Sequence, residues 1–211
     1  MPTILSSFLE SLRRYPSGAE LIPGEMDKWL EPWGFTTYRT YYGPGSEQQW
    51  YRLLQNMTNA AKHELSQNCD PNDDPNTISK LEDLFSLDPR SDPETLNGLT
   101  LDEVRQVYKD KTGGKPISAD LNIYSCFIVA DAEVLKDNEL HFIKLAESDY
   151  DPTVQIPSHS RIGPRRYFGW IRMSSLRLLS IWFELDLYCF AEICNFTSGG
   201  PGGWWTVDDD R

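Results

Sequence analysis

The chain lacks several features that would identify a function directly. Its four cysteines include no C-x-x-C pair, so neither a zinc ribbon nor a thioredoxin-like motif is indicated. No apolar run reaches the roughly 18 residues that a membrane-spanning helix needs, so no membrane is expected. The first residues include Glu10, Arg13 and Arg14 and no continuous apolar stretch, so a secretion signal is not predicted. We therefore expect an intracellular, cytoplasmic protein.

Positive charge is also scarce. The 20 Lys and Arg residues are outnumbered by 32 Asp and Glu residues, which gives a formal net charge of -12. A phosphate backbone would repel such a chain, so nucleic acid is not an expected partner. Acidic residues occur along the whole chain, and we interpret the charge as a solubility feature rather than a binding surface.

Catalytic and metal-binding signatures are missing as well. The three histidines, His63, His141 and His159, are far apart and lack metal-ligand spacing, so we expect no metal and no cofactor. The acidic loop after Asp70 has Pro75 where an EF-hand requires Gly, which favours a plain surface loop. No G-x-S-x-G elbow is present. Catalytic residues stay unassigned, although His159, in a polar loop with several arginines, could act as a general acid or base.

Apolar and aromatic residues are plentiful, by contrast. Hydrophobic residues make up 39% of the chain and include seven Trp, which indicates a packed core rather than a disordered chain. A length of 211 residues suits one domain. We expect a single domain over 1–211, with an N-terminal helix and Pro/Gly-rich linker over 1–32, a core over 33–194 and a Gly-rich tail over 195–211.

The most informative stretch is residues 33–65, which predicts a strand, a turn and a long helix. Thr, Tyr and Phe dominate residues 35–42 and favour a strand. Gly-Pro-Gly then ends the strand, and Ser46 with Gln49 has the spacing of a helix capping box. A turn before a helix is a place where phosphates bind. Here, however, the Lys of a P-loop and the third Gly of a dinucleotide site are missing, so a plain turn is favoured.

Periodicity predicts the remaining elements. An amphipathic helix over 2–15 either docks on the body or binds a partner, with docking favoured. Three successive strands in the second half favour an α+β fold, with a mostly antiparallel sheet of about four strands and helices packed on one face. The expected strands span 121–130, 141–146 and 167–173, and an apolar helix is expected to follow over 176–194.

Four segments resemble a family of small, functionally uncharacterised fungal proteins. They are WGFTTYRTYYGPGSEQQW, LDPRSDPETLNGLTLDEVRQVY, KPISADLNIYSCFIVADAEVL and YFGWIRM. The resemblance covers roughly residues 30–185. It implies an intracellular fungal protein and assigns no catalytic residue.

Arg39 and Arg172 are the most informative single residues, because each lies within a predicted strand beside aromatic residues. A half-buried arginine needs either a carboxylate partner or an anionic ligand. Two interpretations follow. The arginines form structural ion pairs, with Asp88, Asp92 and Asp120 as available partners. Alternatively, they grip a small organic anion in a ligand-binding pocket that five residues would line: Tyr38, Arg39, Tyr41, Trp170 and Arg172.

Two functional hypotheses remain. The favoured one is a non-catalytic binding or interaction module with a protein partner, or with a second copy of itself in a homodimer. It is favoured because no nucleophile–base pair or metal set appears in the sequence. The alternative is a small enzyme or carrier that binds an organic anion in the Arg/aromatic pocket.

Overall fold

A computed structural model describes residues 2–18, 20, 22, 24–117, 125–136, 142–151, 168–195 and 204–205. No helix in this part of the chain is long and apolar enough to cross a membrane. A short 3-10 helix (Met26–Trp29) follows the first α-helix. The α-helices are α1 (Ile4–Ser11), α2 (Ser46–Gln67), α3 (Pro75–Leu84), α4 (Pro93–Leu96), α5 (Leu101–Lys109), α6 (Ala132–Lys136), α7 (Leu178–Leu187) and α8 (Phe190–Asn195).

Within the described residues, the main sheet has six strands in the order β4-β2-β5-β6-β7-β8. Its strands are β2 (Thr37–Arg39), β4 (Pro89–Arg90), β5 (Cys126–Ala130), β6 (Phe142–Glu147), β7 (Trp170–Ser174) and β8 (Trp204–Trp205). β2 pairs in parallel with both β4 and β5, whereas β5, β6 and β7 pair antiparallel. A separate two-stranded sheet joins β1 (Trp33–Gly34) to β3 (Phe85–Ser86).

The α+β prediction is confirmed, but the sheet is mixed rather than mostly antiparallel. The helices between β2 and β5 explain the difference. α2 and α3 carry the chain from β2 to β4, and α4 with α5 carry it from β4 to β5. Crossover connections of this length allow parallel pairing, whereas tight turns do not.

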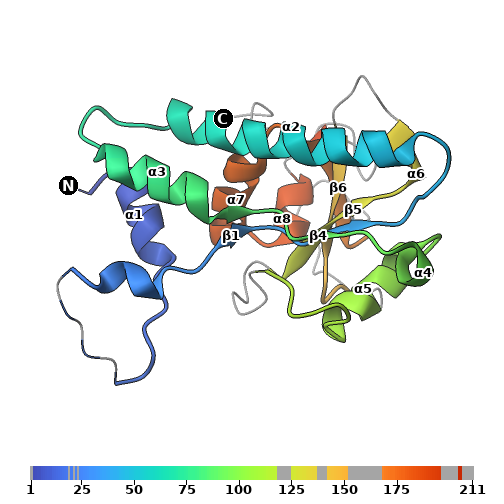
Figure 1. The fold of residues 1–211 in the computed structure, drawn as a ribbon, viewed down its shortest axis with the longest axis horizontal. Coiled ribbons are helices and arrows are strands. Elements are labelled where there is room, and N and C mark those ends of the chain that lie inside the picture. The colour runs from blue at the N-terminus through green and yellow to red at the C-terminus, as the bar shows by residue number, and fades with distance from the viewer. Residues whose placement is uncertain are drawn as a thin grey trace, which may run out of the picture.

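Helices cover both faces of the sheet, which corrects the expectation of a single covered face. Neighbouring residues of β5 point to opposite sides. Ile128 packs in one core with apolar residues of α1, α2, α3 and α7, while Phe127 packs in another with Val104 and Tyr108 of α5. Figure 1 shows α2 along one side of the strands and α5 on the other.

Within the range 35–42 that was expected to form one strand, only Thr37–Arg39 does so, as β2, whereas β1 (Trp33–Gly34) precedes this range and belongs to a different sheet. Gly34 is the last residue of β1. It has a φ of 125°, and a side chain there would place its Cβ 2.0 Å from the carbonyl oxygen of Ser86. Only glycine permits this close approach of β1 to β3.

The predicted capping box at the start of α2 does not form. Gly45, in the left-handed region at φ 76°, occupies the N-cap position, and Ser46 is the first helical residue. The Ser46 hydroxyl donates to the carbonyl of Gly43 at 2.6 Å and accepts from Nη2 of Arg39 at 2.9 Å. The serine therefore links the end of β2 to the start of α2.

The first helix docks on the body, as the sequence favoured. Leu5, Phe8, Leu9 and Leu12 belong to the main core. The ring of Phe8 lies 5.1 Å from that of Trp33, edge to face.

The helix expected over 176–194 divides into α7 and α8. Tyr188 adopts an extended conformation at the break. The Glu192 carboxylate accepts a hydrogen bond from the backbone amide of Cys189 at 2.9 Å. This bond lies at the start of α8.

A buried carboxylate joins α2 to α7. Glu64 of α2 is only 3% exposed. It accepts hydrogen bonds from the backbone amides of Leu179 (2.9 Å) and Ser180 (3.4 Å) and from the Ser180 hydroxyl. Burial raises its pKa above the ordinary 4.5, although these hydrogen bonds favour the charged form. Glu64 thus caps the first turn of a helix more than a hundred residues further along the chain.

Glu64→Gln is expected to destabilise the protein by about 1–3 kcal/mol, because the amide nitrogen of Gln cannot accept the hydrogen bonds that a carboxyl oxygen accepts. The raised pKa sets the pH dependence. The wild-type carboxyl contributes most stability below its unfolded pKa, and this contribution falls as the pH rises through its folded pKa. The deficit of Glu64→Gln should therefore be larger at about pH 4 than at about pH 8.

Urea unfolding at both pH values measures this difference. Glu82→Gln on α3 controls for the loss of one negative charge. An equal deficit at the two pH values would contradict the assignment.

Candidate functional site

The structure does not bring the five predicted site residues into one pocket. Tyr38 aligns across the sheet with Val129, Lys144 and Arg172, so Tyr38 and Arg172 share a face with two strands between them. Arg39 points to the opposite face, toward α2. Trp170 lies with the α5-side core, whereas Tyr41 packs beside Trp50 and Val134 on the α2 side.

Arg172 takes part in a network of ion pairs. Its Nη2 atom pairs with Oε1 of Glu133, and Lys144 pairs with Asp131 at 2.6 Å and with Glu133. The Lys144 ammonium also lies 5.4 Å from the Trp170 ring centre. The structural-pair interpretation is thus confirmed for Arg172, but the partner is Glu133 and not one of the expected aspartates.

The three aspartates predicted as partners lie elsewhere. Asp88 pairs with Arg90, and Asp92 caps α4 by accepting from the Glu94 amide. Asp120 lies outside the described residues.

Tyr38 is a core residue. It is 1% exposed, and its ring meets that of Phe127 edge to face at 5.6 Å. Burial raises the pKa of its phenol to about 12. A side chain enclosed in this way cannot stack on a ligand.

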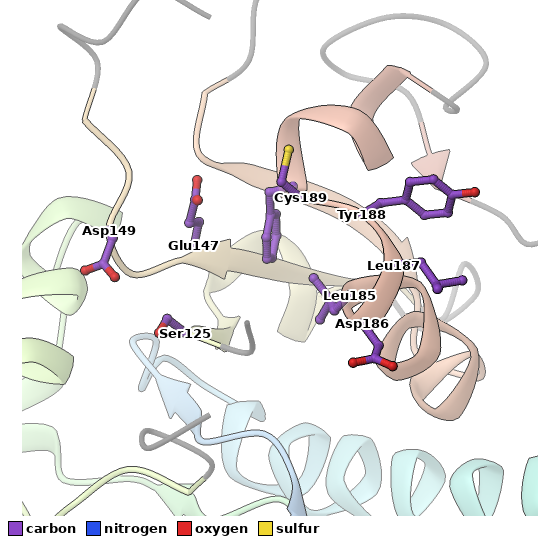
Figure 2. Close-up of a pocket in the computed structure, with 9 residues that line it drawn as sticks. Ser125, Glu147, Asp149, Leu185, Asp186, Leu187, Tyr188 and Cys189 are labelled. Carbon is purple, nitrogen blue, oxygen red and sulfur yellow. The ribbon is translucent and has the colours of Figure 1, made fainter. Parts of the chain in front are cut away.

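A cavity of about 310 Å³ lies at the other end of β5 from Arg39 (Figure 2). One side is lined by Ser125, just before β5, by Glu147, the last residue of β6, and by Asp149, which follows β6. The last residues of α7 and the break before α8 line the other side. Leu185 and Phe190 are buried and provide an apolar floor. The remaining lining residues are Asp186, Leu187, Tyr188 and Cys189.

Negative charge surrounds this apolar floor. Asp149 lies 3.8 Å from the Lys109 ammonium and is largely exposed. Asp186 forms no ion pair or hydrogen bond with any other described residue. Figure 2 shows Glu147 and Asp149 on the strand side of the cavity and Asp186 on the α7 side. The arrangement offers an apolar surface with carboxylates at its rim.

Metal binding finds no support in the part of the chain that the structure describes, because no three His, Cys, Asp or Glu residues there could hold an ion. His63 is exposed on α2, and His141 and His159 lie outside that part. Among the described cysteines, Cys69 and Cys189 are exposed and form no disulfide, and burial raises the pKa of the Cys126 thiol.

Sequence reasoning missed the cavity. Its walls come from the start of one strand, the end of another and a helix break, and only the folded chain brings these together. One signal was present: the acidic residues Glu184, Asp186 and Glu192 interrupt a mostly apolar segment, which a continuous buried helix would not favour.

Comparison with protein-family models, with curated proteins and with solved structures finds no match to this chain.

Tyr38→Phe tests the assignment of Tyr38 to the core. Between pH 10.0, where an ordinary tyrosine ionises, and about 12, ionisation favours the unfolded wild-type chain. The stability that Tyr38 contributes below that range is lost as the pH rises through it. Tyr38→Phe should match wild type within about 1 kcal/mol at neutral pH and exceed it by on the order of 1–3 kcal/mol in strong alkali.

Urea unfolding at neutral pH and at about pH 11 measures the difference. Tyr51→Phe, at an exposed position on α2, is the matched control. If Tyr38→Phe and Tyr51→Phe show the same pH dependence, Tyr38 is not buried.

Proposed function

We propose that the protein is a non-catalytic binding module whose cavity, shown in Figure 2, holds a small organic cation. One observation carries the proposal: buried apolar side chains form the floor of the cavity and carboxylates form its rim. An amine on an aromatic or aliphatic body matches both parts. The described residues of the cavity present no arginine or lysine, so an organic anion fits it poorly.

The size of the cavity supports this ligand class. Small-molecule sites range from about 300 to 1,000 Å³, so 310 Å³ suits a compact ligand. Leu187 is 66% exposed at the rim, beside the buried Leu185 and Phe190. Apolar area is therefore available both below the ligand and beside it.

Charge supports the same class. Asp186 stands at the rim with its carboxylate uncompensated by the described residues. The net charge of -12 raises the concentration of cations near the surface and favours their approach.

The cellular setting rests on the sequence. The resemblance to uncharacterised fungal proteins supports a cytoplasmic fungal binding protein. Microscopy of a tagged chain in a fungal host tests this location, and an extracellular signal would contradict it.

Asp186→Asn tests the ligand class with phenethylamine as the probe and phenethyl alcohol as its neutral counterpart. Wild type should bind the amine more tightly than the alcohol. Asp186→Asn should weaken amine binding about fivefold, because an ion pair at an exposed carboxylate is worth up to about 1 kcal/mol. Isothermal titration calorimetry at low salt measures both affinities.

Asp83→Asn, on the exposed side of α3, carries the same charge change away from the cavity and is the control. Equal affinity for amine and alcohol, or equal weakening by both variants, would contradict a cation site at Asp186.

A further inference from the structure

We propose that Arg39 and the first turn of α2 form a second site, which binds a small tetrahedral oxyanion such as a phosphate or sulfate group. The site is independent of the cavity and of the function proposed for it.

The first observation is a buried positive charge without a counter-ion. Arg39 is 6% exposed, and none of the described carboxylates lies within 4.0 Å of its guanidinium. Arg105 provides the comparison within this chain. It is equally buried, but it pairs with Asp102 and donates to two backbone carbonyls. The Tyr42 ring, whose centre lies 4.4 Å from the guanidinium carbon, offsets only part of the cost of burying this cation, and a bound anion would offset more.

The second observation is that the hydrogen-bonding capacity of Arg39 is incompletely used. Its Nε donates to the carbonyl of Tyr41 at 3.0 Å, Nη1 to the Ser91 hydroxyl at 3.4 Å and Nη2 to the Ser46 hydroxyl at 2.9 Å. All three acceptors are neutral. A guanidinium has five N–H donors, so two remain without an acceptor among the described residues.

The third observation is the position of Ser46 as the first residue of α2, a helix of 22 residues. The amide of Ser46 donates to Gly43, and that of Gln49 to Gly45. The amides of Glu47 and Gln48 donate to none of the described acceptors. Free amides and the positive end of the helix dipole therefore lie next to the guanidinium, and both favour an anion.

The topology places these groups where open sheets bind ligands. β4, β2 and β5 are parallel, and Arg39 is the last residue of β2, paired with the last residue of β5, Ala130. Ser91 follows the end of β4 directly. Ligands of parallel sheets bind outside these carboxyl ends.

The nearest carboxylates do not fill the site. Asp92 is held by the α4 N-terminus, where it accepts from the Glu94 amide and the Thr95 hydroxyl. Glu47 is exposed in the first turn of α2. Both carboxylates limit the affinity for a dianion, and neither pairs with Arg39.

Inorganic phosphate is the probe in the first experiment. The protein is titrated with phosphate at constant ionic strength, and the apparent affinity is taken from the rise in Tm. Wild type should respond. Arg39→Met should bind phosphate about tenfold more weakly or not at all, since two charge-assisted hydrogen bonds are lost. Arg172→Met, which removes a strand arginine already paired with Glu133, should respond like wild type.

A second variant keeps Arg39 in place in case Arg39→Met fails to fold. Ser91→Asp puts a carboxylate beside Nη1 at an exposed position. It should raise Tm in phosphate-free buffer and abolish the phosphate response, because the chain then supplies its own counter-ion. The proposal is overturned if wild type shows no phosphate response, or if Ser91→Asp responds to phosphate as wild type does.

Phenyl phosphate distinguishes the two sources of the anion. Tighter binding than inorganic phosphate supports an organic phosphoester as the natural occupant, and equal binding supports the free ion. A wild type that binds neither overturns the site.

Discussion

The arrangement of the two halves of the chain depends on one buried carboxylate. Glu64, near the end of α2, accepts the first free amides of α7 and so fixes the direction in which α7 leaves β7. α7 then places Trp182 against Phe8, Trp33 and Phe35. The same helix ends at Leu185 and Asp186, which line the cavity. A capping interaction between distant helices therefore positions both the aromatic core and the candidate site.

The two candidate sites lie at opposite ends of β5 and have opposite charge. The start of β5 carries Ser125 and the carboxylate-rimmed cavity. Its last residue, Ala130, pairs with Arg39, where a guanidinium adjoins a helix N-terminus. Because β2 runs parallel to β5, the last residues of both strands lie at the same edge of the sheet. The start of α2 follows the end of β2 and so lies at this edge too. The mixed sheet thus places the two proposed sites at opposite ends of β5.

Local patterns predicted much of the fold. Within the described residues, the strands expected over 121–130 and 167–173 appear as β5 (Cys126–Ala130) and β7 (Trp170–Ser174), and the first helix docks through its apolar face as favoured. The parallel edge could not be predicted, because β4 is a two-residue strand that begins with a proline and has no hydrophobic alternation. The position of α5 on the second face of the sheet could not be predicted either, because it depends on that edge.

The candidate sites were less predictable than the fold. The sequence offered an anion-binding role for Arg39 as one of two interpretations, and it favoured a plain turn at Gly-Pro-Gly-Ser. Only the fold joins them, through Ser46. The Arg/aromatic pocket predicted from the sequence does not form as one site, because strand alternation puts Tyr38 and Arg39 on opposite faces of the sheet. The cavity depends on contacts between residues about 40 to 60 positions apart, which periodicity cannot reveal.

A crystal structure grown with phenethylamine tests the proposed function most directly. The ring is expected to lie against Phe190 and Leu185, with the ammonium within hydrogen-bonding distance of the Asp186 carboxylate. A cavity that stays empty at saturating amine, or that is filled by a side chain of the protein itself, would contradict it.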